Sequence, residues 1–181
     1  LFSMTLILGH FSIIPFIAPY LQLNIGFSEN EVALLYAIGG ATTVVCMPLF
    51  GRLADRFGHA TIFTIASVGA LFSIYAITNL PQVVLPVALL IAVSFFIVAS
   101  GRNIPATTLV TSVVRPEKRG SFMSIRQSVN EAGLALSSFV AGLLVVERPD
   151  GSLGQYHLVG YFAIGMSILA VFLARRLRSV S

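Results

Sequence analysis

Residues 50–63 read FGRLADRFGHATIF, and this stretch places charged side chains between two long apolar segments. It overlaps an uncharged segment over residues 32–50 on one side and another over residues 60–78 on the other. The charges, and the two glycines that frame them, stand at Gly51, Arg52, Asp55, Arg56 and Gly58. What these charges indicate depends on whether the rest of the chain is surrounded by water or by lipid.

The composition of the whole chain indicates that this solvent is lipid. Of the 181 residues, 56% are hydrophobic and only 10% are charged, whereas soluble domains carry about 25% charged residues. The net charge of +4 is gathered in three short clusters, which argues against nucleic-acid binding. The single cysteine, Cys46, excludes a disulfide within the chain. The composition therefore predicts an integral membrane protein.

Six segments are predicted to cross the membrane as helices, since a spanning helix needs about 20 mainly apolar residues. They cover residues 2–24, 31–50, 60–78, 84–113, 121–146 and 157–174. The first is interpreted as a span and not as a signal peptide, because no basic region precedes it. The alternating pattern of β-barrel strands is not seen. The predicted fold is an all-α membrane protein, with six transmembrane helices in one bundle over residues 1–181.

The basic residues of the loops gather on one side of the predicted membrane. They are Arg52, Arg56, Arg115, Lys118, Arg119, Arg175, Arg176 and Arg178. The loops of the other side hold a single basic residue, Arg148. Because cytoplasmic loops are enriched in Lys and Arg, the basic loops and both ends of the chain are predicted to face the cytoplasm.

The predicted helices divide into two units of three, residues 1–78 and 84–178. The first helix of each unit carries proline in its later half, in PFIAP at 15–19 and in GRNIP at 101–105. These two helices start on opposite sides of the membrane, which is the pattern of a 3+3 inverted repeat. Interrupted helices in matching positions of such repeats point to a binding site. The alternative is that proline is simply common in membrane helices.

The octapeptide GRLADRFG at residues 51–58 resembles motif A of the major facilitator superfamily, a signature of the form G-x-L-a-D-r-x-G. The resemblance ends there, because family members usually continue with a basic pair and this chain has His59 and Ala60. Residues 100–145 look like helices ten and eleven of bacterial drug- or sugar-efflux members. The resemblance implies half of a twelve-helix transporter of a bacterial inner membrane, and it favours the C-terminal half over the N-terminal half.

By this resemblance the protein exports a small solute by alternating access, coupled to protons as an antiporter or by symport. Asp55, Arg52 and Arg56 would form a conformational latch against the start of the fifth helix, near Gly120 and Ser121. Because the chain does not begin with Met, we expect it to be a fragment. Its expected partners are lipid, the substrate, protons, and the missing N-terminal half or a second copy. The competing interpretation is a facilitator-like membrane subunit that transports nothing and serves as a scaffold or assembly factor.

Charged side chains at membrane depth are expected to have a function, because each costs a few kcal/mol to insert. Arg102 and Glu131 lie at similar predicted depth, roughly 20 Å from the basic side at 1.5 Å per residue, so an ion pair or shared water network is geometrically available. Glu131 is the candidate proton carrier, and a purely structural pair is the alternative. Arg126 lies nearer the basic side and could reach the headgroups. His10 is a candidate for a proton step, or a histidine that serves packing.

Uncharged polar side chains within the spans are candidates for a substrate cavity, or else for stabilising helix contacts. They are Tyr20, Gln22, Tyr36, Asn103, Gln127 and Asn130. Small residues at four-residue spacing let helices approach closely. Two such stripes are predicted to serve packing, one through Gly133, Ser137 and Ala141 and the other through Ser138 and Gly142.

The sequence contains no P-loop, no metal-spaced His or Cys cluster and no nucleophile elbow. ATP-driven transport and a membrane enzyme therefore lose support, and no cofactor, metal or nucleic-acid partner is expected. The substrate itself is left open, since sugars, drugs and amphipathic metabolites all fit the polar and aromatic candidates.

Overall fold

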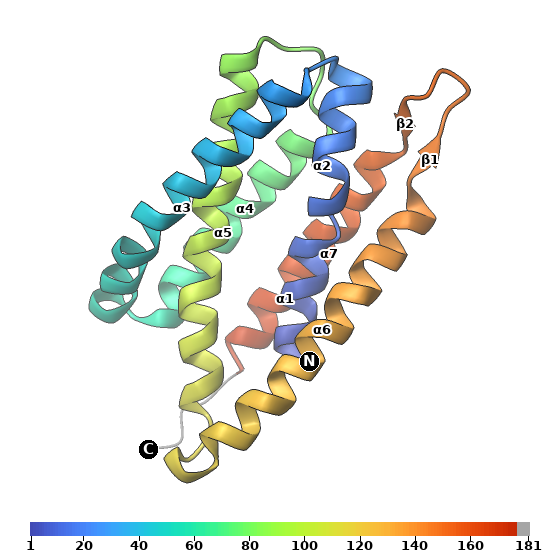
Figure 1. The fold of residues 1–181 in the computed structure, drawn as a ribbon. Helices are drawn as coiled ribbons and strands as arrows, with labels where there is room; N and C mark the ends of the chain where they lie inside the picture. The colour runs from blue at the N-terminus through green and yellow to red at the C-terminus, as the bar shows by residue number, and fades with distance from the viewer. Residues whose placement is uncertain (177–181) are drawn as a thin grey trace.

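Figure 1 shows the computed structural model of the chain, which describes residues 1–176 as a bundle of long helices. Its helical elements are α1 (Phe2–Phe11), α2 (Ile14–Tyr20), the π-helical turn η1 (Leu21–Ile25), α3 (Glu29–Phe57), α4 (His59–Thr78), α5 (Leu85–Ser112), the 3-10 turn η2 (Pro116–Lys118), α6 (Arg119–Leu144) and α7 (Tyr156–Ala174). Two short strands between α6 and α7 are β1 (Val146–Glu147) and β2 (Leu153–Gly154). The prediction for Arg178, which also ends the second repeat unit, falls outside the described residues.

The first predicted span is a helical rod with a break, and the name first rod is used for α1, α2 and η1 together (Phe2–Ile25). α1 ends at Phe11 and α2 begins at Ile14, with Pro15 in the first turn of α2. A proline there costs no helical hydrogen bond, because the first N–H groups of a helix have no partner within it. The carbonyl of Ile13, at the break, accepts a hydrogen bond from the hydroxyl of the buried Tyr156, 3.0 Å away. The predicted interruption is therefore found in this helix, just before its first proline.

The matching interruption predicted in α5 is absent from the structure. α5 runs from Leu85 to Ser112 and passes through Pro105 as one helix, so the prediction of a break over residues 101–105 is wrong. A proline inside a helix removes one backbone hydrogen bond, and membrane helices tolerate this where neighbouring groups replace it. The first helices of the two predicted units thus differ in their backbone.

α3 extends well beyond the predicted span, over 29 residues to Phe57. Its start is fixed by a capping box. The Ser28 hydroxyl accepts a hydrogen bond from the backbone N–H of Glu31, and the Glu31 carboxylate accepts one from the N–H of Ser28. Its C-cap is Gly58, whose φ of 91° is a backbone conformation that residues other than glycine rarely adopt. α4 begins at the next residue, so a single glycine separates two long helices.

Five helices are long and apolar enough to cross a membrane, counted over residues 1–176. They are the rod from α1 to η1, α3, α4, α5 and α7. α6 has 26 residues, but Arg126, Asn130 and Glu131 give its first half a more polar composition than the other five. The all-helical membrane class predicted from the sequence is confirmed, and α6 differs from its neighbours by its polar side chains.

The helices form two groups that stand side by side in Figure 1. In one group α5 packs against α3 and α4, and in the other α1 packs against α6 and α7. Contact between α4 and α7 joins the groups. The junction between α3 and α4, the junction between α5 and α6, and the end of α7 all lie at the lower end of the bundle in Figure 1. The basic residues at these three places are therefore gathered at one end, whereas Arg148 lies at the other end, in the hairpin of β1 and β2.

Apolar side chains fill the contacts between the helices. The larger core gathers residues from the rod and from α3, α4, α5 and α7, among them Ile13, Leu35, Ile74, Phe95 and Val159. A smaller core near the basic end gathers Phe2, Phe63, Ala106 and Ala170. Burial of such side chains stabilises the packed bundle through close van der Waals contact.

The small-residue stripe predicted on α6 is its contact face. The buried residues of α6 are Gly133, Ser137 and Ala141. A Cβ added to Gly133 would come within 3.0 Å of the Ile7 side chain, so glycine allows α1 and α6 to approach closely. Ser138 and Gly142 are exposed, and the prediction that they serve packing is wrong for the contacts within this chain.

A short hairpin of β1 and β2 replaces the plain loop expected before α7. Its strands pair in antiparallel register, with Glu147 opposite Leu153. Asn24 at the end of the rod holds it by two hydrogen bonds, from its Nδ2 to the carbonyl of Leu153 at 2.8 Å and from the N–H of Leu153 to its Oδ1 at 2.9 Å. In the turn, hydrogen bonds from the hydroxyl and the N–H of Ser152 hold the pKa of the Asp150 carboxyl below its usual value. The hairpin is thus anchored to the rod.

The contact between α4 and α7 depends on Gly160, because a Cβ added there would clash with the side chain of Thr78. We expect Gly160→Ala to destabilise the protein by about 1–3 kcal/mol, as overpacking does. Gly165→Ala on the same helix is the matched control, since nothing lies within 4 Å of its added Cβ. The control should be neutral or stabilising, because alanine favours a helix. Thermal unfolding in detergent, followed by circular dichroism, compares the two, and equal stabilities would contradict this packing.

Candidate functional site

A pocket of about 340 Å³ opens between α1, α5 and α6. It is lined by Ser3, Leu6, Ile7, Phe11, Asn103, Thr107, Arg126 and Asn130. α1 supplies mainly apolar side chains, whereas α5 and α6 supply amide, hydroxyl and guanidinium groups. Apolar walls with a few convergent polar groups are typical of small-molecule sites.

The polar side chains of the pocket come from one face of each helix. Asn103 and Thr107 are four residues apart on α5, as are Arg126 and Asn130 on α6, so each pair shares a face. The Nη2 of Arg126 donates a hydrogen bond to Thr107 Oγ1 at 3.1 Å and so joins the two helices. Within the described chain, the buried Arg126 Nε and Asn130 Oδ1 have no hydrogen-bond partner. Because buried polar atoms are normally hydrogen-bonded, these two are available to a ligand in the pocket.

A second pocket of about 320 Å³ lies on the other side of the polar stripe of α5. It shares Asn103 and Thr107 with the first and adds Met47 of α3 with Ile104 and Thr108 of α5. The polar edge of α5 therefore borders hollows toward both α3 and α6. Asn103 and Thr107 are the residues common to both.

Arg102 and Glu131 do not form the predicted pair. Arg102 is only 1% exposed, and none of its guanidinium nitrogens has a hydrogen-bond partner among residues 1–176. Glu131 is exposed on α6, where it accepts a hydrogen bond from Gln127. No salt bridge within residues 1–176 joins them. The reason is the orientation of α6, which turns its small-residue stripe toward α1 and leaves Glu131 off the contact face.

His10 lies in the core of the bundle. It is 8% exposed, and its ring stacks on Phe95 of α5 with centroids 5.0 Å apart and planes at 9°. It does not line the pocket between α1, α5 and α6. The structure therefore places His10 among packed core side chains and outside this pocket. Gln127 is exposed and also lies outside the pocket.

Three of the predicted cavity residues lie elsewhere. The hydroxyl of Tyr20 donates to the carbonyl of Leu80 at 2.9 Å, and Tyr20 lines a separate pocket of about 210 Å³ beside the hairpin. Tyr36 packs edge-on against Phe96 with ring centroids 6.1 Å apart. Gln22 is half-buried in η1. The structure thus brings together Asn103, Arg126 and Asn130, and it leaves these three outside their pocket.

The motif at residues 51–58 is the end of α3 with its capping glycine, and not a loop between two spans as the sequence predicts. The helix continues from Gly51 to Phe57 without a break. Of the two glycines only Gly58 has a positive φ, at 91°. Gly51 is an ordinary helical residue with open space beside it.

The charged side chains of the motif are exposed at the basic end of the bundle. Asp55 Oδ1 lies 3.7 Å from Nε2 of His59, the first residue of α4. The guanidinium of Arg56 lies 5.2 Å from the ring centroid of Phe57, and Arg52 is exposed. No hydrogen bond or ion pair in the described part of the chain joins Asp55 to the start of α6. The predicted latch contact is thus not formed in this structure.

Apolar helices around a polar pocket define a multi-pass integral membrane protein. Residues 1–181 match the Major Facilitator Superfamily, and the chain belongs to this family of membrane transporters, which are not enzymes. It is similar to Solute carrier family 67 member A1 of Homo sapiens, with 27% identity over 147 residues, which make up 79% of this chain and 33% of the relative. The chain therefore spans about a third of the length of the curated relative it matches.

Sequence reasoning missed Thr107, Ser3 and the apolar wall of the pocket. The available signal was the four-residue spacing of Asn103 with Thr107, which repeats in Arg126 with Asn130 and marks one polar face on each helix. The apolar wall carried no signal, because apolar side chains occur all round α1. Across the described residues, no group of three or more His, Cys, Asp or Glu side chains could hold a metal ion.

The two glycines of the motif should respond differently to alanine. We expect Gly58→Ala to destabilise the protein by about 1–3 kcal/mol, because a side chain strains a backbone at φ 91°. Gly51→Ala should be neutral or slightly stabilising, since Gly51 is helical and its added Cβ meets nothing within 4 Å. Unfolding midpoints in detergent measure both variants. A larger loss for Gly51→Ala than for Gly58→Ala would show that the junction differs from the one described.

Proposed function

We propose that this chain is the C-terminal half of a secondary transporter that carries a small solute across a bacterial inner membrane by alternating access. The observation that carries the proposal is the pocket between α1, α5 and α6, with unpartnered polar atoms on Arg126 and Asn130. In transporters built from repeats, substrate sites lie inside the membrane at the interface of the repeats. The human relative is named a solute carrier, and transport of a solute is what we carry over to this chain.

The contacts between helices support the division into units of residues 1–78 and 84–178. If the two units are related by symmetry, the first rod corresponds to α5, α3 to α6, and α4 to α7. Under this correspondence each main helix contact maps onto another contact that the structure shows. The contact of α1 with α6 becomes that of α5 with α3, the contact of α1 with α7 becomes that of α5 with α4, and the contact of α4 with α7 maps onto itself. A 3+3 inverted repeat has this symmetry. α6 then corresponds to α3, which supports its inclusion as the sixth span.

Exposed apolar side chains on α3 and α6 support a partner that covers them. On α3 they include Val44, Val45 and Leu49, and on α6 they include Ile125, Phe139 and Leu143. Exposed apolar patches mark protein or membrane interfaces, and α3 and α6 are also the helices that border the two hollows beside the polar face of α5. We propose that the N-terminal half, or a second copy of this half, closes the pocket from that side.

The basic end of the bundle is proposed to face the cytoplasm. Arg52, Arg56, Arg115, Arg119 and Arg175 are exposed there, and cytoplasmic loops are enriched in Lys and Arg. Both termini of this segment would then lie on the cytoplasmic side.

Proton coupling is proposed to use Glu131. Its carboxylate is exposed on the face of α6 that we assign to the partner half, and Gln127 donates a hydrogen bond to it. Such a carboxylate can bind and release a proton as the cavity opens to either side. Arg102 and His10 lie buried in this half, and we assign to them a supporting electrostatic role in the same step.

The latch is proposed to form in a state of the transporter other than the one described here. Asp55, Arg52 and Arg56 are exposed, and within residues 1–176 no ion pair joins them to the start of α6. Helix ends attract charges of the opposite sign, so the N-terminal end of α6 is a suitable site for the Asp55 carboxylate when the helices approach.

A transport pocket should be reached from both sides of the membrane in turn. In a protein with Cys46 replaced by serine and no other cysteine, we expect Asn130→Cys to react with a membrane-impermeant maleimide added to either side of sealed vesicles. Leu169→Cys, on the outer face of α7, is the control and should react from neither side. Labelling of Asn130→Cys from one side only would favour the non-transporting scaffold.

Glu131→Gln should abolish pH-driven transport, because an amide cannot bind and release a proton. The measurement is ethidium and disaccharide flux in vesicles with an imposed pH gradient. Glu147→Gln is the matched control, since Glu147 is an exposed acid in β1, and it should keep normal flux. Unchanged pH-driven flux in Glu131→Gln would remove Glu131 from the mechanism.

A further inference from the structure

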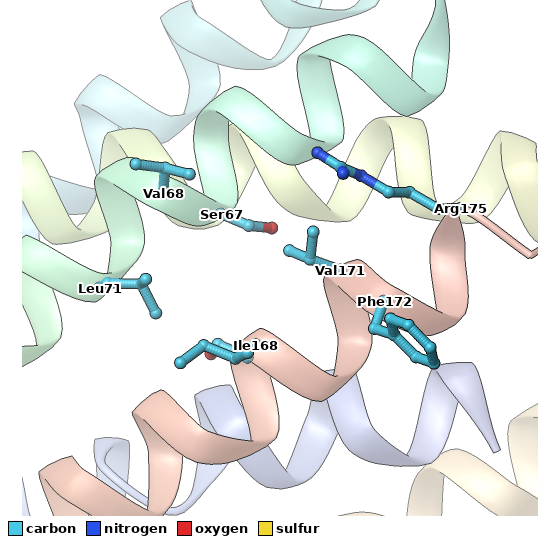
Figure 2. Close-up of a pocket in the computed structure, with 8 residues that line it drawn as sticks. Ser67, Val68, Leu71, Ile168, Val171, Phe172 and Arg175 are labelled. Atoms are coloured by element: carbon cyan, nitrogen blue, oxygen red, sulfur yellow. The ribbon is translucent and has the colours of Figure 1, made fainter.

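A groove of about 260 Å³ between α4 and α7 lies apart from the proposed transport pocket and shares no residue with it (Figure 2). α4 supplies Val68 and Leu71, and α7 supplies Ile168 and Val171. In Figure 2 the Arg175 side chain extends from α7 across the groove toward α4, with these apolar side chains further along. The groove is therefore apolar along its length and cationic at one end.

The cationic end continues into a second depression of about 280 Å³ at the start of α4. Arg175 borders both hollows, and Thr61 and Thr64 add hydroxyl groups to the second. Arg175 is exposed, and no salt bridge within residues 1–176 neutralises it. The charge therefore faces the surroundings of the bundle at its basic end.

A buried hydroxyl lies between these two regions. Ser67 lines the groove and is 1% exposed, and its Oγ has no hydrogen-bond partner within residues 1–176. Figure 2 shows this oxygen directed into the space between α4 and α7. Ser167 of α7 also lines the groove, and its buried Oγ likewise has no hydrogen-bond partner within residues 1–176. The groove thus presents a cation with hydroxyls at one end and mainly apolar side chains along its length, with two buried hydroxyls among them.

We propose that this groove binds one anionic phospholipid of the surrounding bilayer. Arg175 binds the phosphate, with Thr61 and Thr64 beside the headgroup, and Ser67 donates a hydrogen bond to an ester carbonyl. One acyl chain then runs along the apolar part of the groove. A cationic end that leads into a mainly apolar groove matches the headgroup and acyl chain of a phospholipid, and a bare cation at a membrane surface favours an anionic headgroup over a zwitterionic one.

A fluorescent reporter of bound lipid must lie beside the proposed path of the acyl chain. Ile168 lies seven residues before Arg175, or about 10 Å along α7, so an acyl chain whose headgroup is held at Arg175 passes beside Ile168. The chain contains no Trp. In a protein without other tryptophans, Ile168→Trp reports on the groove, because this side chain is 55% exposed and lines it. Leu169→Trp, at nearly the same depth and 41% exposed outside the groove, is the matched control.

The test is tryptophan quenching in vesicles of phosphatidylcholine that contain a minor fraction of brominated phosphatidylglycerol. We expect the anionic lipid to be enriched about fivefold at residue 168 relative to residue 169, the factor expected for one cation near the surface. When phosphatidylcholine carries the bromine instead, residue 168 should show no enrichment. Equal quenching at both positions by brominated phosphatidylglycerol, or equal enrichment of both lipids at residue 168, overturns the proposal.

Two charge variants distinguish lipid binding in this groove from a general attraction of anionic lipid to the basic end. Arg175→Gln, combined with Ile168→Trp, should remove the enrichment of phosphatidylglycerol. Arg115→Gln removes an exposed arginine at the same end that does not line the groove, and it should leave the enrichment unchanged. An equal loss in both variants would show that overall surface charge gathers the lipid and would overturn the site. None of these measurements depends on transport activity.

Discussion

Hydrocarbon offers no hydrogen bonds, so every backbone N–H and C=O within the membrane must find a partner in the protein. This constraint explains why the described chain is helical almost throughout and why its irregular backbone lies at the ends of the bundle. The break in the first rod obeys it as well, because Tyr156 of α7 supplies a hydrogen bond to Ile13 where the helix opens. Serine and threonine hydroxyls bond back to their own helices, as Thr78 does to Ile74 at 2.8 Å.

In the same lipid surroundings, a polar side chain away from water is costly unless it has a partner or a function. Arg102 and Arg126 lie on neighbouring helices and yet have opposite surroundings, since Arg102 is enclosed in the core whereas Arg126 borders a pocket and contacts Thr107. The pocket is therefore polar on one side because the polar groups of α5 and α6 lie on the faces that border it. Small residues on the adjoining face of α6 bring α1 close enough to form its apolar wall.

Periodicity and charge in the sequence were sufficient to predict the helices, their approximate ends and three of the pocket residues, Asn103, Arg126 and Asn130. They failed where rotation about a helix axis decides the outcome. The depth of Arg102 and Glu131 could be estimated from residue counts, but the direction of each side chain depends on how its helix packs. The end of α3 was also misplaced, because charged residues were taken to mark a loop, whereas an α-helix readily accommodates Arg52 and Asp55 once it leaves the apolar layer.

The paired hydrogen bonds between Asn24 and Leu153 have a mechanical consequence. They join the end of the first rod to the hairpin that leads into α7, and beside them the rings of Tyr20 and Tyr156 pack at a tilt of 40° with centroids 4.8 Å apart. A tilt of the rod must then drag the start of α7 along, or else break both bonds at once. At the end of the bundle that carries the hairpin, the first rod and α7 are consequently expected to move together as one unit.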